Sequence, residues 1–190
     1  MTTEEVTHDQ GAGRQVATNQ VRHIVWDWNG TLFDDQHVVV DATNASLAAV
    51  GVHRTISAEQ YKDFYRRPME EFYAELVGEP IPDGQWPVLD AAFAEHYLSR
   101  MRECGLSADA LTAMDRWAPR GQSLLSMFGH DELLRLTGEF ELHPRLGRID
   151  GRPDDPDFGP KAKYLVKHLE QLIALDPELT ADQIALIGDC

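Results

Sequence analysis

The chain has 190 residues, an apolar content of 43% and a formal net charge of −15. This length allows one good core, with or without a smaller insertion. The negative charge argues against a nucleic-acid partner, because affinity for a phosphate backbone rests on clustered lysine and arginine. The two cysteines, Cys104 and Cys190, lie in unrelated contexts, and no apolar segment of signal or membrane length is visible. We therefore expect a cytoplasmic protein without a membrane partner.

Residues 1–20 are polar, which predicts a disordered N-terminal arm. Residues 21–26 are β-branched and aromatic, which predicts a strand, and this strand ends in Asp27, two residues before Asn29 and Gly30. Two interpretations fit this ending. An Asn-Gly pair between apolar runs is typical of a β-hairpin turn. Alternatively, Asp27 is a nucleophile or metal ligand at the carboxyl end of a central parallel strand, where open α/β sheets place their sites.

Between residues 35 and 105 the sequence predicts only helices, four in number. The second begins at a capping box formed by Ser57 and Gln60 and is expected to stop at Pro68. The fourth is a long helix over residues 86–104 with apolar residues spaced four apart, which is typical of a buried face. The stripe consists of Leu89, Phe93, Tyr97 and Met101.

After residue 107 the pattern changes to alternating helices and strands. Strands are predicted over residues 122–128, 145–149 and 184–188, and a helix is predicted to begin at Lys161. This alternation is typical of a parallel sheet with right-handed crossovers, so the predicted fold class is α/β.

Three of the predicted strands end in a side chain that can take part in catalysis or bind a ligand: Asp27, Ser126 and Asp189. Parallel strands present their carboxyl ends at the same edge, so these residues are expected in one crevice. The hairpin interpretation explains only the Asn-Gly pair, and the common crevice therefore favours a chemical role for Asp27.

The order of four elements resembles the haloacid dehalogenase (HAD) superfamily, and within it the phosphoglycolate-phosphatase-like branch. These elements are the Asp-Trp-Asn-Gly-Thr segment that begins at Asp27, Ser126 after a strand, Lys161 opening a helix, and the Ile-Gly-Asp segment that ends at Asp189. The resemblance implies a HAD-like Rossmannoid core over residues 21–34 and 106–190. It also implies that residues 35–105 are a helical C1 cap, inserted after the first strand.

The resemblance also implies a role for each motif residue. Asp27 would attack phosphorus and form an aspartyl-phosphate. Asp27, the backbone carbonyl of Asn29, and Asp189 would hold Mg²⁺. Ser126 would hydrogen-bond the phosphoryl oxygens, and Lys161 would offset negative charge and orient Asp27. The predicted function is Mg²⁺-dependent hydrolysis of a small phosphorylated metabolite.

Two features depart from the family pattern. Asn29 stands where such phosphatases usually carry a second aspartate as general acid and base, a role typically worth about 10²- to 10⁴-fold. The chain also ends at Cys190, before the further strand that the family pattern contains, which suggests a fragment or a truncated product. The alternatives are a dehalogenase, a phosphonatase-like enzyme using a Schiff-base lysine such as Lys62, or an inactive HAD-like binding module.

Overall fold

The computed structural model describes residues 21–66, 68–154 and 160–188. These residues form a four-stranded parallel sheet and seven α-helices, which confirms the predicted α/β class. The strand order across the sheet is β3-β2-β1-β4. The strands are β1 (His23–Trp26), β2 (Gly121–Gly129), β3 (Arg148–Arg152) and β4 (Ile184–Ile187). None of the helices in these ranges combines the length and apolarity needed to cross a bilayer.

Strand β1 is interior to the sheet and pairs in parallel with a strand on each side. Trp26, its last residue, lies opposite Leu124 of β2 and Ile187 of β4. A hairpin would instead pair β1 with the segment directly after Gly30. The hairpin interpretation is therefore wrong, although Gly30 does make a tight turn with a φ of +68°.

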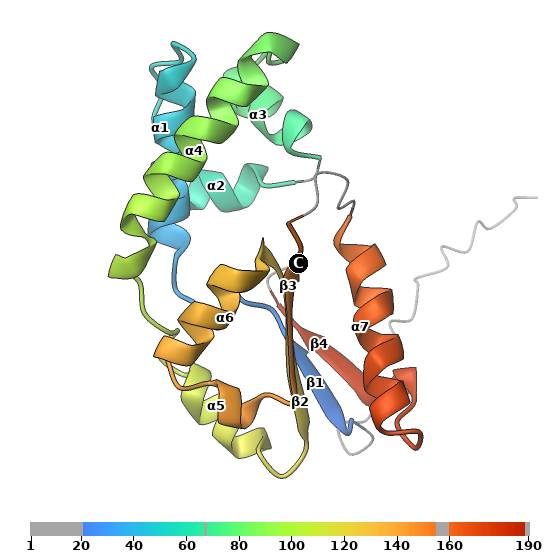
Figure 1. The fold of residues 1–190 in the computed structure, drawn as a ribbon. Helices are drawn as coiled ribbons and strands as arrows, with labels where there is room; N and C mark the ends of the chain where they lie inside the picture. The colour runs from blue at the N-terminus through green and yellow to red at the C-terminus, as the bar shows by residue number, and fades with distance from the viewer. Residues whose placement is uncertain (1–20, 67, 155–159, 189–190) are drawn as a thin grey trace, which may run out of the picture.

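Helices cover both faces of the sheet (Figure 1). Ile24 and Trp26 of β1 pack on the face covered by α5 (Ala110–Trp117) and α6 (His130–Glu139). Val25, whose side chain points the opposite way, packs against the face covered by α7 (Lys161–Leu175). This alternation is the two-residue period of a strand, and all four residues of β1 are buried because helices cover both faces of the sheet.

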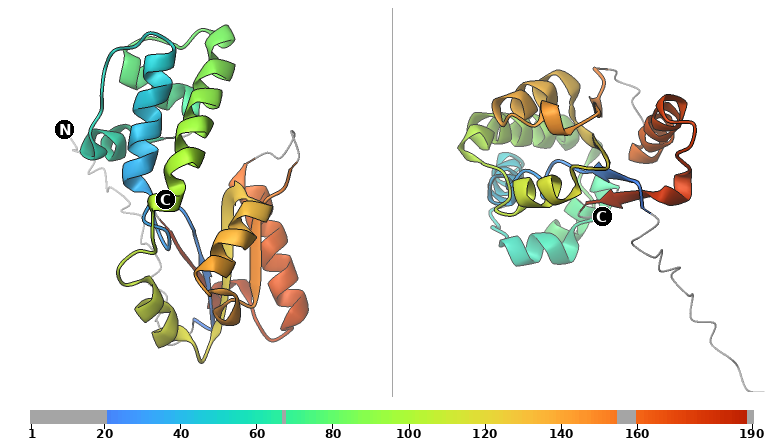
Figure 2. Two further views of the ribbon diagram at one scale, coloured as in Figure 1. Left: turned by 60° about the vertical axis from the view of Figure 1, so that its left-hand side comes forward. Right: turned by 90° about the horizontal axis from the view of Figure 1, so that it is seen from below.

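The four remaining helices lie together beyond the end of the sheet (Figure 2, left). They are α1 (Gln36–Ala49), α2 (Ala58–Phe64), α3 (Met69–Val77) and α4 (Trp86–Arg100). They surround an apolar cluster of their own, which includes Leu47, Phe72 and Leu76, all fully buried. These four helices fall within residues 35–105, the segment predicted to be a cap. The boundaries between core and cap stay a prediction.

Several predicted element bounds need correction. The capping box of Ser57 and Gln60 is present, but α2 ends at Phe64, and Pro68 instead precedes α3 as its N-cap residue. The strand predicted over residues 145–149 begins only at Arg148. The preceding residues His143–Arg145 form a 3₁₀ turn that contains a proline, whose fixed φ suits a turn.

Two further elements differ in extent. The helix predicted over residues 86–104 ends at Arg100 and continues as a 3₁₀ turn, Met101–Glu103. Strand β2 runs on to Gly129, so Ser126 lies within the strand rather than at its end. Its ladder with β1 nevertheless stops at Leu124, so Ser126 still lies beyond the last paired residue of β1.

A buried chain of hydrogen bonds fastens α7 to the sheet. The Ser123 hydroxyl on β2 lies 2.8 Å from Nε2 of His23 on β1 and 2.8 Å from Nε2 of His168 on α7. His168 Nδ1 lies 2.6 Å from Asp150 Oδ2 on β3, and Arg148 pairs with the same carboxylate. A carboxylate only accepts, so His168 donates from Nδ1 to Asp150. When His168 carries no second proton, its Nε2 accepts from Ser123, and Ser123 in turn accepts from His23.

This arrangement predicts a pH-dependent stability. Burial, followed by the nearby His168, lowers the pKa of His23 to about 4, whereas the unfolded chain has a value near 6.5. Between these values the unfolded state binds a proton that the folded state does not. The free energy of unfolding should therefore fall as pH drops from 7 to 4, by up to about 3 kcal/mol through this one group.

Urea titrations between pH 7 and pH 4.5 on the wild type and His23→Gln measure this contribution. The loss of stability on acidification should be smaller in His23→Gln than in the wild type. The exposed residue His53 provides the control, and His53→Gln should keep the wild-type pH dependence. Equal slopes in the wild type and His23→Gln would contradict the assignment.

Candidate active site

Asp27 lies directly after β1, on the side of the sheet that faces α7. It continues the alternation of the strand, so its side chain points to the same face as that of Val25. Lys161 is the first residue of α7, and its Nζ forms a short ion pair with Asp27 Oδ2. The Asp27 side chain is 17% exposed and that of Lys161 is 41% exposed. The structure thus joins two of the predicted catalytic residues in a pair that opens to solvent.

The backbone around Asp27 holds its carboxylate in place. The Asp27 N–H donates to the Ile187 carbonyl at 2.8 Å, and Asp27 Oδ1 accepts the Trp28 N–H at 2.8 Å. The end of β4 approaches closely, because a Cβ built on Gly188 would lie 3.0 Å from the Asp27 Cβ. Asp189, the third predicted metal ligand, lies outside the described residues.

Ser126 reaches the same edge of the sheet as Asp27. It follows Leu124 by two residues, and Asp27 follows Trp26, the β1 residue paired with Leu124, by one. Ser126 is buried, and its Oγ accepts the Phe128 N–H at 3.0 Å. The register therefore brings Ser126 near the Asp27 end of β1, while the hydrogen bond that its hydroxyl makes is with the nearby backbone of Phe128.

Aromatic packing fixes the loop that leaves Asp27. Trp28 is fully buried and stacks on Phe33 with ring centroids 4.9 Å apart and planes inclined by 9°. Phe140, at the end of α6, packs against both rings. The chain folds back between them, with the Phe33 N–H donating to the Trp28 carbonyl at 2.9 Å. Because Trp28 is held in the core, its neighbour Asp27 is directed to the opposite face.

The Asn29 side chain makes its hydrogen bonds toward the helices rather than toward Asp27. Its Nδ2 lies 2.7 Å from Asp35 Oδ2 and 2.9 Å from the Tyr97 hydroxyl of α4. Asp35 is only 1% exposed, and it also accepts the Gly30 N–H at 2.9 Å and the Tyr97 O–H at 2.6 Å. Burial, followed by the Asp35 carboxylate, raises the pKa of Tyr97, so this hydroxyl keeps its proton and donates it.

Sequence reasoning missed Asp35 and Tyr97 as partners of the site. An aspartate at the start of a helix is usually exposed, whereas Asp35 is buried, and Tyr97 was predicted only as part of an apolar stripe. Tyr97 is buried as that stripe predicted, but it is the only stripe member with a hydroxyl, and a buried tyrosine hydroxyl usually finds a hydrogen-bond partner. That rule was the available signal.

Two of the three predicted magnesium ligands, Asp27 and Asn29, lie within the described residues. None of the described residues form a group of three or more His, Cys, Asp or Glu side chains placed to hold a metal. The predicted set needs fewer, since it combines the Asp27 carboxylate and the Asn29 backbone carbonyl with Asp189. These are the oxygen donors that a hard cation prefers, so the chemistry of the set fits Mg²⁺.

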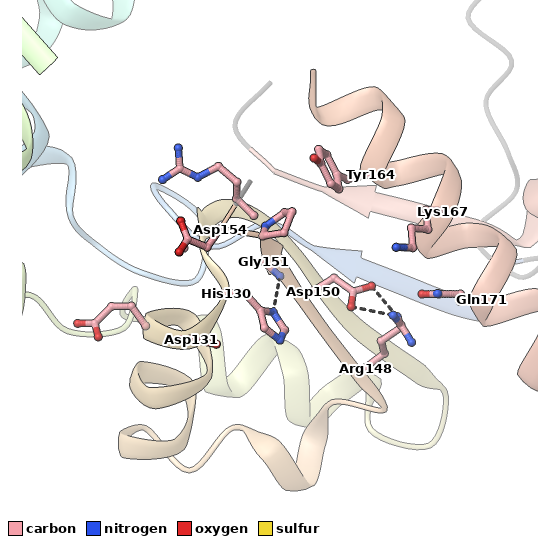
Figure 3. A pocket seen from close by; sticks show the side chains of 13 residues that line it. His130, Asp131, Arg148, Asp150, Gly151, Asp154, Tyr164, Lys167 and Gln171 are labelled. Carbon is pink, nitrogen blue, oxygen red and sulfur yellow. Dashed lines mark hydrogen bonds and ion pairs between the residues drawn. The ribbon is translucent and has the colours of Figure 1, made fainter. Parts of the chain in front are cut away.

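A separate cavity of about 830 Å³ lies at the β3 edge of the sheet, between α6 and α7 (Figure 3). Its lining includes Arg148 and Asp150, which pair with one another, and His130, whose Nδ1 accepts the Gly151 N–H at 3.1 Å. Asp27 and Lys161 are not among its lining residues. This cavity is thus distinct from the predicted catalytic pair.

The Tyr97 hydroxyl should contribute measurably to stability. Tyr97→Phe removes a buried donor to Asp35 and an acceptor for Asn29, and should lower the free energy of unfolding by about 1–3 kcal/mol. Chemical denaturation measures this loss. Tyr65→Phe is the matched control, because within the described ranges the Tyr65 hydroxyl makes no hydrogen bond, and it should change stability by less than about 0.5 kcal/mol. Equal effects of the two substitutions would contradict the network.

Comparison with known proteins finds similarity at the level of structure. No family model matches the sequence, and no curated protein matches it. A haloacid dehalogenase-like hydrolase from Streptococcus pneumoniae is 18% identical, with a TM-score of 0.70 over 90% of this chain and 77% of that one. A predicted phosphatase from Clostridium acetobutylicum is 15% identical, with a TM-score of 0.68 over 89% and 76%.

A predicted phosphoglycolate phosphatase from Haemophilus somnus is 13% identical, with a TM-score of 0.64 over 90% of this chain and 77% of that one. At such identities the comparison speaks for the fold alone. The fold of the described chain is that of the haloacid dehalogenase-like hydrolases and phosphatases, as the order of its motifs predicted.

Proposed function

We propose that the protein is a Mg²⁺-dependent phosphohydrolase that transfers the phosphoryl group of a small phosphorylated metabolite first to Asp27 and then to water. The observation that carries the proposal is the ion pair of Asp27 and Lys161 at the carboxyl edge of a parallel sheet. Open α/β sheets place their sites at this edge. A carboxylate held there beside a cation is equipped for covalent catalysis on an anionic substrate.

Each residue of the site has a distinct task in this proposal. Asp27 attacks phosphorus through a carboxylate oxygen, and the bond between phosphorus and the leaving oxygen breaks. Lys161 attracts the phosphate and offsets its charge, which matters in a chain with a net charge of −15. Ser126 donates a hydrogen bond to a phosphoryl oxygen. Mg²⁺, held by Asp27, the Asn29 carbonyl and Asp189, supplies further charge neutralisation when bound.

Two further observations support a hydrolase of this kind. The structural neighbours include proteins described as phosphatases, which favours phosphate esters or anhydrides as substrates. Helices α1 to α4 stand beyond the end of the sheet (Figure 2, left), where a cap could cover the Asp27 edge and exclude water during transfer.

Substitution of the catalytic pair should abolish phosphate release without unfolding the protein. Asp27→Asn should lower kcat/KM by about 10³-fold or more, because an amide cannot form the acyl-phosphate. Lys161→Ala should lower it by about 10²- to 10³-fold through lost charge stabilisation. Lys163→Ala, which removes an exposed lysine of the same helix, should leave activity near the wild-type value. The measurement is phosphate release from a panel of phosphate compounds, with circular dichroism to verify folding.

Metal dependence provides a second test of the same proposal. Removal of divalent ions with EDTA should reduce phosphate release to background, and added Mg²⁺ should restore it. Phosphate release that is unchanged in Asp27→Asn would contradict the covalent mechanism. Phosphate release that is unchanged by EDTA would contradict the proposed dependence on Mg²⁺.

A further inference from the structure

The hydrogen-bond network around Asn29 uses both N–H groups of its side-chain amide. Asp35 accepts only, so the Asn29 side chain must present Nδ2 to it rather than Oδ1. The same Nδ2 also lies 2.9 Å from the Tyr97 hydroxyl. Tyr97 gives its own proton to Asp35, so its oxygen is available as an acceptor for the second N–H. Both N–H groups of Asn29 are therefore used within the network.

We propose that Asp35 and Tyr97 are positioning residues that hold Asn29 without a free donor, so that the site acts on phosphate compounds whose leaving group departs unprotonated. The inference rests on the proposed function and narrows its substrate class. Acyl phosphates and aryl phosphates with weakly basic leaving groups belong to this class. Alkyl phosphates, whose alkoxide is strongly basic, do not.

The chemical step is balanced without a proton from position 29. An Asp27 oxygen forms a bond to phosphorus as the bond from phosphorus to the leaving oxygen breaks. That oxygen keeps the electron pair and departs as a carboxylate or aryloxide anion. Such an anion is stable in water, whereas an alkoxide would require protonation as it forms, which is the contribution of a general acid.

The network itself suggests a way to restore a proton donor. Asn29 and Asp35 can exchange their functional groups without stranding a partner. The amide created by Asp35→Asn could accept the Gly30 N–H at its oxygen and donate its N–H to position 29. The carboxyl group created by Asn29→Asp could then accept from that amide and from the Tyr97 hydroxyl. The single substitution Asn29→Asp lacks this balance, because it places two carboxyl groups at hydrogen-bond distance.

Leaving-group dependence tests the proposal. We would measure kcat and KM on acetyl phosphate and on a series of aryl and alkyl phosphates for the wild type, Asn29→Asp, Asp35→Asn and the double variant Asn29→Asp/Asp35→Asn. The wild-type kcat/KM should fall steeply as the leaving group becomes more basic. The double variant should gain about 10²-fold or more in kcat on alkyl phosphates and show a shallower dependence. Asn29→Asp alone should gain less.

Acetyl phosphate is the internal control, since its leaving group needs no proton. The double variant should therefore raise kcat on alkyl phosphates relative to its own kcat on acetyl phosphate, compared with the same ratio in the wild type. A shallow leaving-group dependence in the wild type would overturn the proposal, because another residue would then supply the proton. A double variant that gains nothing on alkyl phosphates, or no more than Asn29→Asp, would overturn it as well.

A readout independent of activity separates this proposal from the proposed function. In the wild type, NMR should find the two Asn29 amide protons protected from exchange with water, and Tyr97→Phe should accelerate the exchange of one of them by at least tenfold. Unprotected protons in the wild type would overturn the positioning roles. A wild type that hydrolyses no phosphate compound, yet protects these protons, would refute the phosphohydrolase and support the positioning roles of Asp35 and Tyr97.

Discussion

The alternation of side chains along β1, continued past the last residue of the strand, is the constraint on which the site depends. Val25 and Asp27 point toward α7, while Trp26 and Trp28 point to the other face. Trp28 is locked by its stack on Phe33, so the direction of Asp27 is not free. A reactive carboxylate is thus aimed by hydrophobic packing on the opposite face, where burial of a large aromatic side chain supplies the driving force.

Much of the sheet could be predicted from the sequence, because a strand buried on both faces appears as a run of mostly apolar residues. The apolar run before Asp27 predicted an interior strand, and the alternation of helices and strands predicted a parallel sheet. The position of Asp27 and Ser126 at the same edge of the sheet followed from the rule that parallel strands end at one edge. The ion pair with Lys161 was expected from the resemblance alone. It depends on α7 beginning close to the carboxyl end of β1, which local sequence does not specify.

Other features could not be read because they depend on pairs distant in sequence. Nothing local to Asp35 indicates that Tyr97, 62 positions away, donates to it. Likewise, the serine at position 123 was one apolar-strand residue among others until β1 and α7 were packed around it. The start of β3 was misplaced because Arg145 and Leu146 resemble strand residues, while the preceding turn at His143–Arg145 depends on how α6 ends.

The hydrogen bonds of Ser123 also have a bearing on the register of α7. A serine hydroxyl carries one proton, so Ser123 can donate to only one of its two histidine partners and must accept from the other. If α7 slid along the sheet by one turn, about 5.4 Å, His168 would leave both Ser123 and Asp150, and several buried polar groups would lose their partners. Apolar contacts alone would distinguish such positions poorly, since one leucine replaces another. These polar contacts therefore fix the position of α7 along the sheet. Lys161 lies two turns before His168 on the same helix, so they also fix where Lys161 meets Asp27.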